Sequence, residues 1–393
     1  MPSMNEVPSG ERVAIGFFGL RNAGKSSLVN AVTGQNLALV SDVKGTTTDP
    51  VRKAMELLPL GPVVIIDTPG LDDEGELGKM RVAKAREIIA QIDVAVVVRD
   101  AAAPASALID DLEKELQERG VPYVNAYTKA DLHPCARKDG ICVSSKTGQN
   151  IAGLKELIAK TAKANAKESR HLIADLLCEG DIAMMVVPID AAAPKGRIIL
   201  PQQQVLRDIL GAHATAIVCQ PEELAAIYAS LPRKPRIVVT DSQVFGRVDS
   251  ILPKEQPLTS FSILFARYKG DLAQLAAGAK TLETLKDGDR VLISEGCTHH
   301  RQCGDIGTEK LPKWITAFAK GAKIVFEFTS GNEFPQDLAP YRLVVHCGGC
   351  MLNAAAMASR LRQASAENVP VVNYGLAIAH MHGILSRSLE PFA

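Results

Sequence analysis

The feature that most constrains the fold of this 393-residue chain is the segment Gly19-Leu20-Arg21-Asn22-Ala23-Gly24-Lys25-Ser26. It fits the pattern G-x-x-x-x-G-K-[ST], and an apolar run over residues 12–19 predicts a strand before it. A helix is predicted after it, over residues 25–33. In this context a glycine-rich backbone can wrap its N–H groups around phosphates at a helix N-terminus. Lys25 would then reach the outer phosphates, and Ser26 would hold Mg²⁺.

Apolar runs alternate with helical patterns along the chain, which predicts parallel sheets covered by helices on both faces. Further strands are predicted over residues 63–66, 94–98 and 123–126, and a helix over 151–160 closes the first part. The alternation restarts near residue 183 and again near residue 291. We therefore expect an α/β protein in which a P-loop domain with a doubly wound, mostly parallel sheet is followed by two smaller α/β domains.

Three further short motifs follow at predicted strand ends. They are Asp67-Thr68-Pro69-Gly70, Thr128-Lys129-Ala130-Asp131 and Ser144-Ser145-Lys146. Asp67 can hold Mg²⁺ through water, and the Gly70 N–H can sense the γ-phosphate. Asp131 can accept hydrogen bonds from guanine N1 and N2, which adenine cannot satisfy, while Lys129 stacks over the base and residues 144–146 contact guanine O6 through backbone N–H groups. Together the motifs predict a GTPase.

The first 160 residues or so resemble the translation-factor-related GTPases, in particular the tRNA-modification and Era-like branch. The resemblance is carried by Asn22-Ala23-Gly24-Lys25-Ser26-Ser27 and by Gly45-Thr46-Thr47-Thr48-Asp49. It implies that Thr47 is the switch threonine on Mg²⁺. It also implies that Asn22 helps bind a potassium ion beside the phosphates, in place of an arginine finger.

Two positions depart from the pattern of that branch. Thr128 stands where asparagine is usual, so we expect a weaker affinity for the base. Leu71 follows the Asp-Thr-Pro-Gly turn, where Ras-like enzymes place a water-orienting glutamine, so we expect slow intrinsic hydrolysis. The simpler interpretation of Leu71 is that it only packs against the switch helix.

A second group of candidate ligands lies in the last third of the chain. It consists of Cys297, His299, His300, Cys303, His346, Cys347 and Cys350. Both stretches follow predicted strands, so they are expected to meet at the carboxyl ends of a parallel sheet. Three cysteines with a variable fourth ligand fit a 4Fe–4S cluster, but a Cys₃His zinc site or a Cys347–Cys350 disulfide has the same spacing.

The fourth ligand stays open between His299, His346 and Cys303, with Asp305 as a further candidate. For any single histidine, a hydrogen bond that supports a ligand is the commoner role. The remaining cysteines are expected to be small buried or surface hydrophobic residues. They are Cys135, Cys142, Cys178 and Cys219.

A GTPase of this branch followed by C-x-H and then H-C-x-x-C resembles the FeFe-hydrogenase maturation GTPases, the HydF family, over essentially the whole chain. Residues 200–206 also resemble the dimerisation region of that family. The resemblance implies a tail 1–9, a GTPase domain 10–168, a dimerisation domain 169–260 and a cluster domain 261–393. It further implies that Cys297, Cys347 and Cys350 bind a 4Fe–4S cluster. Such a protein receives a di-iron precursor from two radical-SAM maturases and delivers it to apo FeFe-hydrogenase, as a homodimer or larger oligomer.

Composition bears on the other function classes. Lys plus Arg and Asp plus Glu number 44 each, so the formal net charge is zero and predicts no nucleic-acid partner. No secretory signal and no 18-residue apolar stretch is visible, so we expect a cytoplasmic protein without a membrane partner. The alternatives are an RNA-binding or ribosome-assembly GTPase with a zinc module and, last, a catalytic iron–sulfur domain.

Overall fold

The computed structural model describes residues 8–34, 51–72, 75–133, 135–165, 170–189, 198–296 and 305–393. The chain divides into two compact units, Met1–Ser169 and Arg170–Ala393, and each is described by itself. Five of the predicted site residues lie outside the described residues: Thr47, Cys297, His299, His300 and Cys303. Within the described residues, no helix is both long and apolar enough to cross a bilayer.

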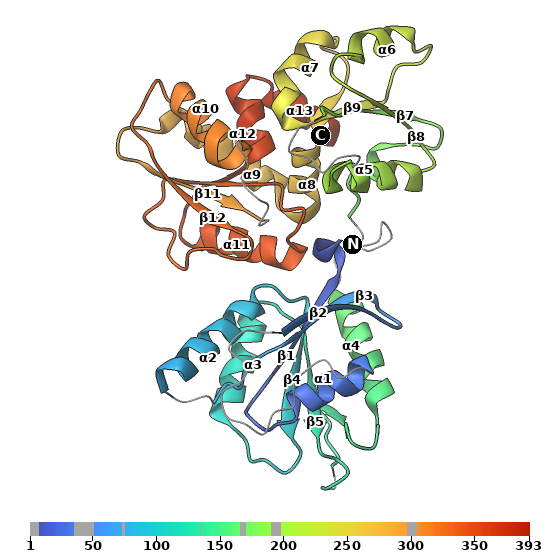
Figure 1. Cartoon of the computed structure of the whole chain (residues 1–393), viewed down its shortest axis with the longest axis vertical. Coiled ribbons are helices and arrows are strands. Elements are labelled where there is room, and N and C mark those ends of the chain that lie inside the picture. The colour runs from blue at the N-terminus through green and yellow to red at the C-terminus, as the bar shows by residue number, and fades with distance from the viewer. Residues whose placement is uncertain are drawn as a thin grey trace. The chain divides into compact units, whose positions relative to one another are not determined.

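The first unit is a six-stranded sheet of order β2-β3-β1-β4-β5-β6, in which only β2 is antiparallel (Figure 1). Its strands are β1 (Val13–Gly19), β2 (Val51–Leu57), β3 (Gly61–Asp67), β4 (Val94–Asp100), β5 (Tyr123–Thr128) and β6 (Gly140–Cys142). Its helices are α1 (Lys25–Thr33), α2 (Gly75–Ile89), α3 (Ala107–Glu118) and α4 (Ile151–Asn165). Separate apolar cores lie on the two faces, one with α1 and α4 and one with α2 and α3. This confirms the doubly wound P-loop domain; β2 and β6 were not predicted.

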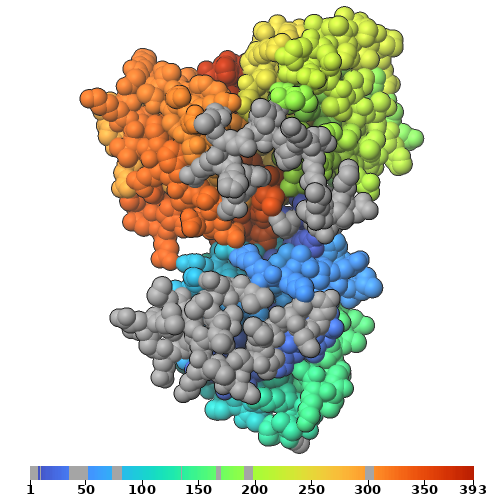
Figure 2. All heavy atoms as spheres, in the orientation of Figure 1, coloured from blue at the N-terminus to red at the C-terminus, as the bar shows by residue number. Residues whose placement is uncertain are grey.

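The second unit contains two four-stranded parallel sheets. The first has the order β10-β9-β7-β8, with β7 (Ile182–Val186), β8 (Thr215–Cys219), β9 (Ile237–Thr240) and β10 (Leu258–Ser260). The second has the order β12-β11-β13-β14, with β11 (Arg290–Glu295), β12 (Val325–Ser330), β13 (Leu343–His346) and β14 (Val371–Asn373). In Figure 2 the atoms around them form two adjoining lobes, green to yellow and orange. β10 directly follows Pro257, in a stretch for which no strand was predicted.

Helices cover both sheets of this unit. Around the first sheet are α5 (Leu200–Gly211), α6 (Leu224–Ser230), α7 (Phe245–Ile251) and α8 (Phe261–Lys269). Around the second are α9 (Leu272–Ala279), α10 (Leu311–Phe318), α11 (Ala354–Ala366) and α12 (Tyr374–Met381), whereas α13 (Leu385–Leu389) contacts β10 of the first sheet. One apolar core includes residues of both sheets, and a second core lies between the first sheet, α5 and α8.

The two sheets repeat one topology. Numbered along the chain, the strands of each have the spatial order 2-1-3-4. In each half a helix follows the fourth strand directly and is capped by the last strand residue. Ser260 accepts from the Ile263 N–H at 3.3 Å, and Asn373 accepts from the Leu376 N–H at 2.9 Å. The unit is therefore built from two halves with the same plan, which the sequence pattern had not revealed.

The halves meet at these equivalent strand–helix junctions. The Asn373 side chain donates to the Ser262 carbonyl at 2.9 Å and to its hydroxyl at 2.8 Å. The Gly375 N–H donates to the same hydroxyl at 3.1 Å. An added Cβ at Gly375 would lie 2.8 Å from the Ser262 Cβ, so only glycine permits this close approach.

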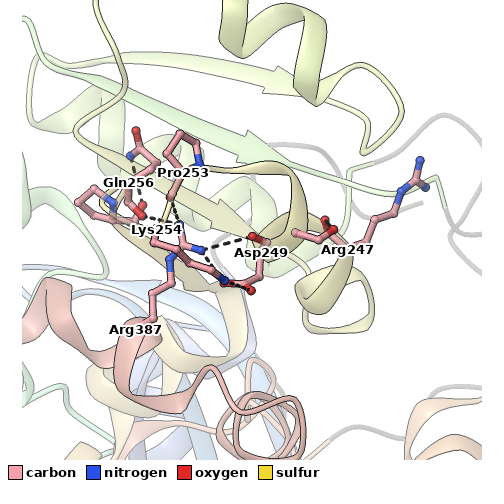
Figure 3. Close-up of polar contacts among 8 residues, drawn as sticks. Arg247, Asp249, Pro253, Lys254, Gln256 and Arg387 are labelled. Carbon is pink, nitrogen blue, oxygen red and sulfur yellow. Dashed lines mark hydrogen bonds and ion pairs between the residues drawn. The ribbon is translucent and has the colours of Figure 1, made fainter.

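The C-terminal helix α13 is tied to the first half by a buried ion pair (Figure 3). Arg387 Nη1 donates to Asp249 Oδ1 at 2.5 Å, and Nη2 donates to the carbonyls of Pro253 and Gln256. The two side chains are 9% and 12% exposed. Although burial opposes it, hydrogen bonds from Lys254 and Arg387 hold the pKa of Asp249 below its usual value.

Candidate functional sites

The phosphate-binding loop lies between β1 and α1, as predicted. Gly24 precedes the helix with a left-handed φ of 86°, which a glycine adopts without steric cost. The Lys25 side chain is 8% exposed, and its ammonium donates to the carbonyls of Leu20 at 2.7 Å and Gly19 at 3.1 Å. The loop thus holds the ammonium inside its own curve.

Three other predicted residues complete this loop. Asn22 is exposed with a left-handed φ of 57°, Ala23 is buried, and Ser27 lies half-buried in the first turn of α1. Their backbone N–H groups belong to the part of the loop and helix start that can face anionic oxygens.

A hydroxyl and a carboxylate meet at the predicted magnesium position. Ser26 Oγ donates to Asp67 Oδ2 at 2.8 Å. The other carboxylate oxygen, Asp67 Oδ1, is buried with no hydrogen-bond partner among the described residues. Burial raises the pKa of Asp67, while Ser26 and the charge of Lys25 oppose the rise. A buried carboxylate oxygen beside a hydroxyl suits Mg²⁺, which prefers oxygen ligands.

The turn after β3 lies against the phosphate-binding loop. An added Cβ at Gly70 would lie 2.5 Å from Arg21 Cγ, so the Gly70 backbone approaches this loop closely. The Arg21 N–H donates to the carboxylate of Asp72 at 2.6 Å. Leu71 is 6% exposed and packs in the core that contains Ile88 of α2. Leu71 is therefore part of an apolar core, which favours the simpler interpretation that its role is packing.

The base-recognition motif is anchored to the phosphate-binding loop through Thr128. This residue is 2% exposed, and its hydroxyl lies 2.6 Å from the carbonyl of Ala23 and 3.1 Å from that of Arg99. Threonine at the usual asparagine position thus still connects the two loops. Lys129 has a left-handed φ of 59°, and its ammonium contacts Asp100 at 2.6 Å.

Asp131, the predicted guanine acceptor, is exposed and held by the next motif. Ser144 Oγ donates to Asp131 Oδ1 at 2.6 Å, and this hydrogen bond holds the pKa of Asp131 below its usual value. Ser145 is half-buried and Lys146 exposed in the turn that follows. The two motifs that are predicted to contact the base therefore lie together, with the carboxylate ionised and exposed to solvent.

The expectation that Cys135 and Cys142 are isolated hydrophobic residues is wrong. They form a disulfide, with their Cα atoms 5.9 Å apart. The chain returns beside β5 as β6, which ends at Cys142, and this brings the two sulfurs together. The bridge closes the loop between the Thr128–Asp131 and Ser144–Lys146 motifs.

The cysteine pair lies in the loop between β13 and α11. Cys347 Sγ accepts from the Gly296 N–H at 2.9 Å and from the Gly349 N–H at 3.3 Å. Gly296 is the last described residue before Cys297, so the two cysteine-bearing stretches approach each other at this sulfur. Cys347 and Cys350 are both free thiols, so the disulfide alternative is not the one in this structure.

Burial controls the protonation of these thiols. It raises the pKa of Cys347 to about 11, while the N–H groups of Gly296 and Gly349 oppose the rise. Burial also raises the pKa of Cys350, and the charge of Lys269 opposes it. Both sulfurs are therefore protonated at neutral pH in the metal-free chain, and a metal would bind them with release of protons.

His346 is engaged through both ring nitrogens. Nε2 lies 2.8 Å from Arg360 Nη1, and Nδ1 lies 2.8 Å from the Cys347 carbonyl. Burial, with the charge of Arg360 second, lowers the pKa of His346 to about 3, so the ring is neutral. Nε2 is then the acceptor and Nδ1–H the donor, and the ring supports the Cys347 loop through hydrogen bonds.

Within the described ranges, no group of three or more His, Cys, Asp or Glu side chains could hold a metal ion. The candidate ligands Cys297, His299, His300 and Cys303 lie in the gap between residues 296 and 305. Two contacts at the loop were missed from the sequence, those of Arg360 and Lys269. Their partners are distant along the chain, so no local pattern could have indicated them.

Comparison with protein-family models accounts for most of the chain. The hydrogen maturase F dimerization domain matches residues 172–270, and the hydrogen maturase F tetramerization domain matches residues 273–391. Together they cover more than half of the sequence. A third model, described as a 50S ribosome-binding GTPase, matches residues 14–129.

The chain belongs to the hydrogen maturase F family. This confirms the family resemblance, and the GTPase match confirms a GTP hydrolase that binds GTP and Mg²⁺. The dimerization and tetramerization domains of hydrogen maturase F indicate an oligomer. The same two domains leave the ribosome-assembly alternative without support.

Curated relatives are similar over a shorter stretch. The chain is 32% identical over 177 residues to the tRNA modification GTPase MnmE of Endomicrobium trichonymphae, covering 41% of this chain and 38% of that protein. It is 33% identical over 156 residues to MnmE of Neisseria meningitidis serogroup C, covering 37% and 34%. The chain thus spans little more than a third of the length of these relatives.

Two solved structures give low overall similarity. Era from Aquifex aeolicus has a TM-score of 0.35 at 17% identity, covering 53% of this chain and 92% of that chain. The G domain of T. maritima FeoB has a TM-score of 0.30 at 24% identity, covering 39% and 99%. At these scores the likeness carries no functional argument.

Proposed function

We propose that this chain is a GTP-dependent scaffold that binds a 4Fe–4S cluster and assembles or delivers the di-iron subcluster of FeFe-hydrogenase. Its partners would be the apo-hydrogenase and the radical-SAM maturases, in the cytoplasm, with neither nucleic acid nor membrane as a partner. The observation that carries the proposal is that both maturase domain models match a unit in which residue 296 approaches Cys347 Sγ. We also propose the domain limits 10–168, 169–260 and 261–393.

Cys297, Cys347 and Cys350 are the proposed cluster ligands, leaving one iron open. The fit is supported by two free thiols in one glycine-containing loop and by two N–H groups directed at Cys347 Sγ, since hydrogen bonds to sulfur tune such clusters. When bound, the cluster would supply an iron with a free coordination position. Because His346 already uses both nitrogens, His299 and Cys303 are the stronger candidates for the fourth position.

For the nucleotide site we propose slow hydrolysis that potassium stimulates, with Thr47 on Mg²⁺ and Asn22 on K⁺. The exposed position of Asn22 in the phosphate-binding loop supports the potassium role. The apolar, buried Leu71 supports the slow rate, because it offers no group to orient water. Binding of GTP would reorder the switch segments and thereby bias docking of a partner.

Anaerobic iron–sulfur reconstitution of the full chain, with iron analysis and electron paramagnetic resonance, tests the cluster. We expect about four iron atoms per chain. Cys347→Ala should lose this iron while GTP hydrolysis continues, and Lys25→Ala should lose hydrolysis while the iron stays. Cys178→Ala, at an exposed thiol, is the matched control and should behave as the wild type.

Two outcomes would overturn the proposal. Normal iron content in Cys347→Ala would contradict the ligand assignment. Zinc near one ion per chain, with no iron after reconstitution, would contradict the cluster and support a zinc module.

A further inference from the structure

A buried arginine of α11 contacts the histidine that precedes the cysteine pair. The chain leaves β13 at His346, passes the free thiols of Cys347 and Cys350, and enters α11, which carries Arg360. Arg360 Nη1 lies 2.8 Å from His346 Nε2. The two residues are 7% and 2% exposed. The segment that carries the thiols is therefore joined at its two ends by one buried side-chain contact.

The guanidinium of Arg360 is held in place by the neighbouring strands. Nη1 also donates to Ser294 Oγ on β11 at 3.3 Å, and Nη2 donates to the Gly331 carbonyl after β12 at 2.8 Å. Ser294 stands three residues before Cys297, and its carbonyl accepts from the Cys347 N–H at 3.0 Å. Arg360 is therefore fixed against the strand ends from which both cysteine-bearing stretches start.

The helix that carries Arg360 is itself fixed to the core. Met357 and Leu361, one turn before and one residue after Arg360, belong to the apolar core that includes residues of both sheets. Arg360 Cζ lies 4.8 Å from the centre of the Phe334 ring. The guanidinium is therefore positioned by the folded scaffold and not by the segment that it contacts.

The partners of His346 determine which ring nitrogen carries the proton. A guanidinium has only N–H donors, so His346 Nε2 accepts from Arg360. A carbonyl oxygen only accepts, so Nδ1, 2.8 Å from the Cys347 carbonyl, carries the proton and donates. The ring is thus held as a single neutral tautomer, and neither nitrogen has a lone pair left for a metal.

We propose that Arg360 is a positioning residue of the cluster site, which acts through His346. It holds the ring in the tautomer that supports the Cys347 carbonyl, and it keeps both ring nitrogens from binding iron. The inference rests on the proposed cluster function. Since a histidine on iron would fill the fourth coordination position, the Arg360–His346 contact leaves that position for another ligand or for the di-iron precursor.

The first test needs no iron. Heteronuclear NMR of the full chain, labelled at the histidine ring nitrogens, reports which nitrogen carries the proton, and His346→Phe identifies the signal. We expect the proton of His346 on Nδ1. In Arg360→Met, which keeps an unbranched side chain and removes the donors, the ring should no longer be held in this tautomer. Arg362→Met, at an exposed arginine of the same helix, should leave the tautomer unchanged.

The second test measures the loss of iron from the reconstituted full chain to a chelator. We expect Arg360→Met and His346→Phe each to lose iron roughly tenfold faster than the wild type, as for other residues that orient ligands. Because Arg360 acts through His346, the double variant should lose iron at the same rate as either single variant, whereas independent effects would multiply to about a hundredfold. Arg360→Lys keeps a donor for Nε2, so its rate should lie between those of the wild type and Arg360→Met.

Several results would overturn the proposal. They are a proton on Nε2 of His346 in the wild type, an unchanged tautomer or wild-type iron loss in Arg360→Met, and multiplied effects in the double variant. If Arg360→Met does not fold, the wild-type tautomer and His346→Phe decide, and a wild-type rate of iron loss in His346→Phe would refute the role. If the wild-type chain itself takes up no iron, the proposed function fails, while the NMR test still reports on the Arg360–His346 contact, which separates the two failures.

Discussion

In both halves of the second unit, the chain makes the same backbone hydrogen bond directly after the third strand of the sheet. The segments that follow this bond differ between the halves. In the first half, the Asp241 N–H donates to the Val186 carbonyl at 3.3 Å; in the second, the Cys347 N–H donates to the Ser294 carbonyl at 3.0 Å. The acceptors lie at the ends of the equivalent strands β7 and β11. Asp241 and Cys347 are therefore equivalent positions on one backbone plan.

In the first half, a short helix begins immediately after this shared position. Asp241 accepts from the Gln243 N–H at 3.0 Å and caps the short helix η3 (Ser242–Val244), which continues into α7. In the second half, residues 347–353 form an irregular loop before α11 begins, and Gly349 has a left-handed φ of 65°. A capped helix start satisfies its own backbone, whereas the glycine-containing loop turns N–H groups toward a sulfur.

The residues that each half places against the strand-end segment of the other half also differ. Lys269, at the end of α8, donates to the loop after β13. His382, directly after α12, lies over Gly246 in α7, where an added Cβ would be 3.1 Å from its ring. Equivalent places thus hold a buried ammonium in one half and an exposed imidazole in the other. The comparison shows that the sheet determines where the strand-end loop lies. The residues of that loop, and those that contact it, determine the chemistry.

The largest expected effect on stability concerns the ion pairs of the two halves. Arg387–Asp249 is buried at the first half, whereas Arg290–Glu327, on β11 and β12, is 43% and 35% exposed. Removal of one partner from a buried pair costs about 3–5 kcal/mol, and an exposed pair contributes about 0–1 kcal/mol. We expect Arg387→Ala to lower the free energy of unfolding by about 3 kcal/mol, since Lys254 still pairs with Asp249.

Denaturant titration of both variants measures this difference. Arg290→Ala, the matched control on the second half, should lose at most about 1 kcal/mol. Equal losses in the two variants would contradict the view that α13 holds the first half through a desolvated contact.

Much of the fold follows from local patterns, because buried parallel strands and the P-loop have strong local signatures. The helix predicted over residues 25–33 coincides with α1, which begins at Lys25 and ends at Thr33. β2 and β6 were missed because both are edge strands whose sequences lack a continuous apolar run. β10 was missed because it has only three residues and directly follows Pro257.

The nucleotide site was predictable for the same reason, since its residues stand in short motifs at strand ends. The cysteines of the 347–350 loop could be predicted from the sequence, but the residues that hold this loop in place could not. Lys269 lies 80 residues or more from the carbonyls that it holds, and Arg360 reaches His346 from a different element. The Cys135–Cys142 bridge was missed because each cysteine was considered by itself, and only the pairing of β6 with β5 brings the two sulfurs together.

A smaller effect is expected at the glycines beside the two equivalent loops. Gly349 has a left-handed backbone, and an added Cβ would lie 2.6 Å from Met357 Cε. Gly349→Ala should therefore cost about 1–2 kcal/mol and weaken iron retention. Gly246→Ala, in α7, meets only the movable His382 ring and gains helix propensity, so its free energy of unfolding should stay within about 1 kcal/mol of the wild type. Thermal unfolding and chelator competition report both quantities, and a reversed order would contradict the assignment of the open loop.

The smallest effect is expected at Asp241, the position equivalent to Cys347. Asp241→Ala removes the cap of η3 and should lower the free energy of unfolding by about 1 kcal/mol. Iron content after reconstitution should be unchanged, because the chain after β9 uses this position to satisfy its own backbone and not to bind a ligand. Loss of iron in Asp241→Ala, in protein that remains folded by circular dichroism, would mean that the first half contributes to the cluster site. The division between a structural and a chemical half would then be wrong.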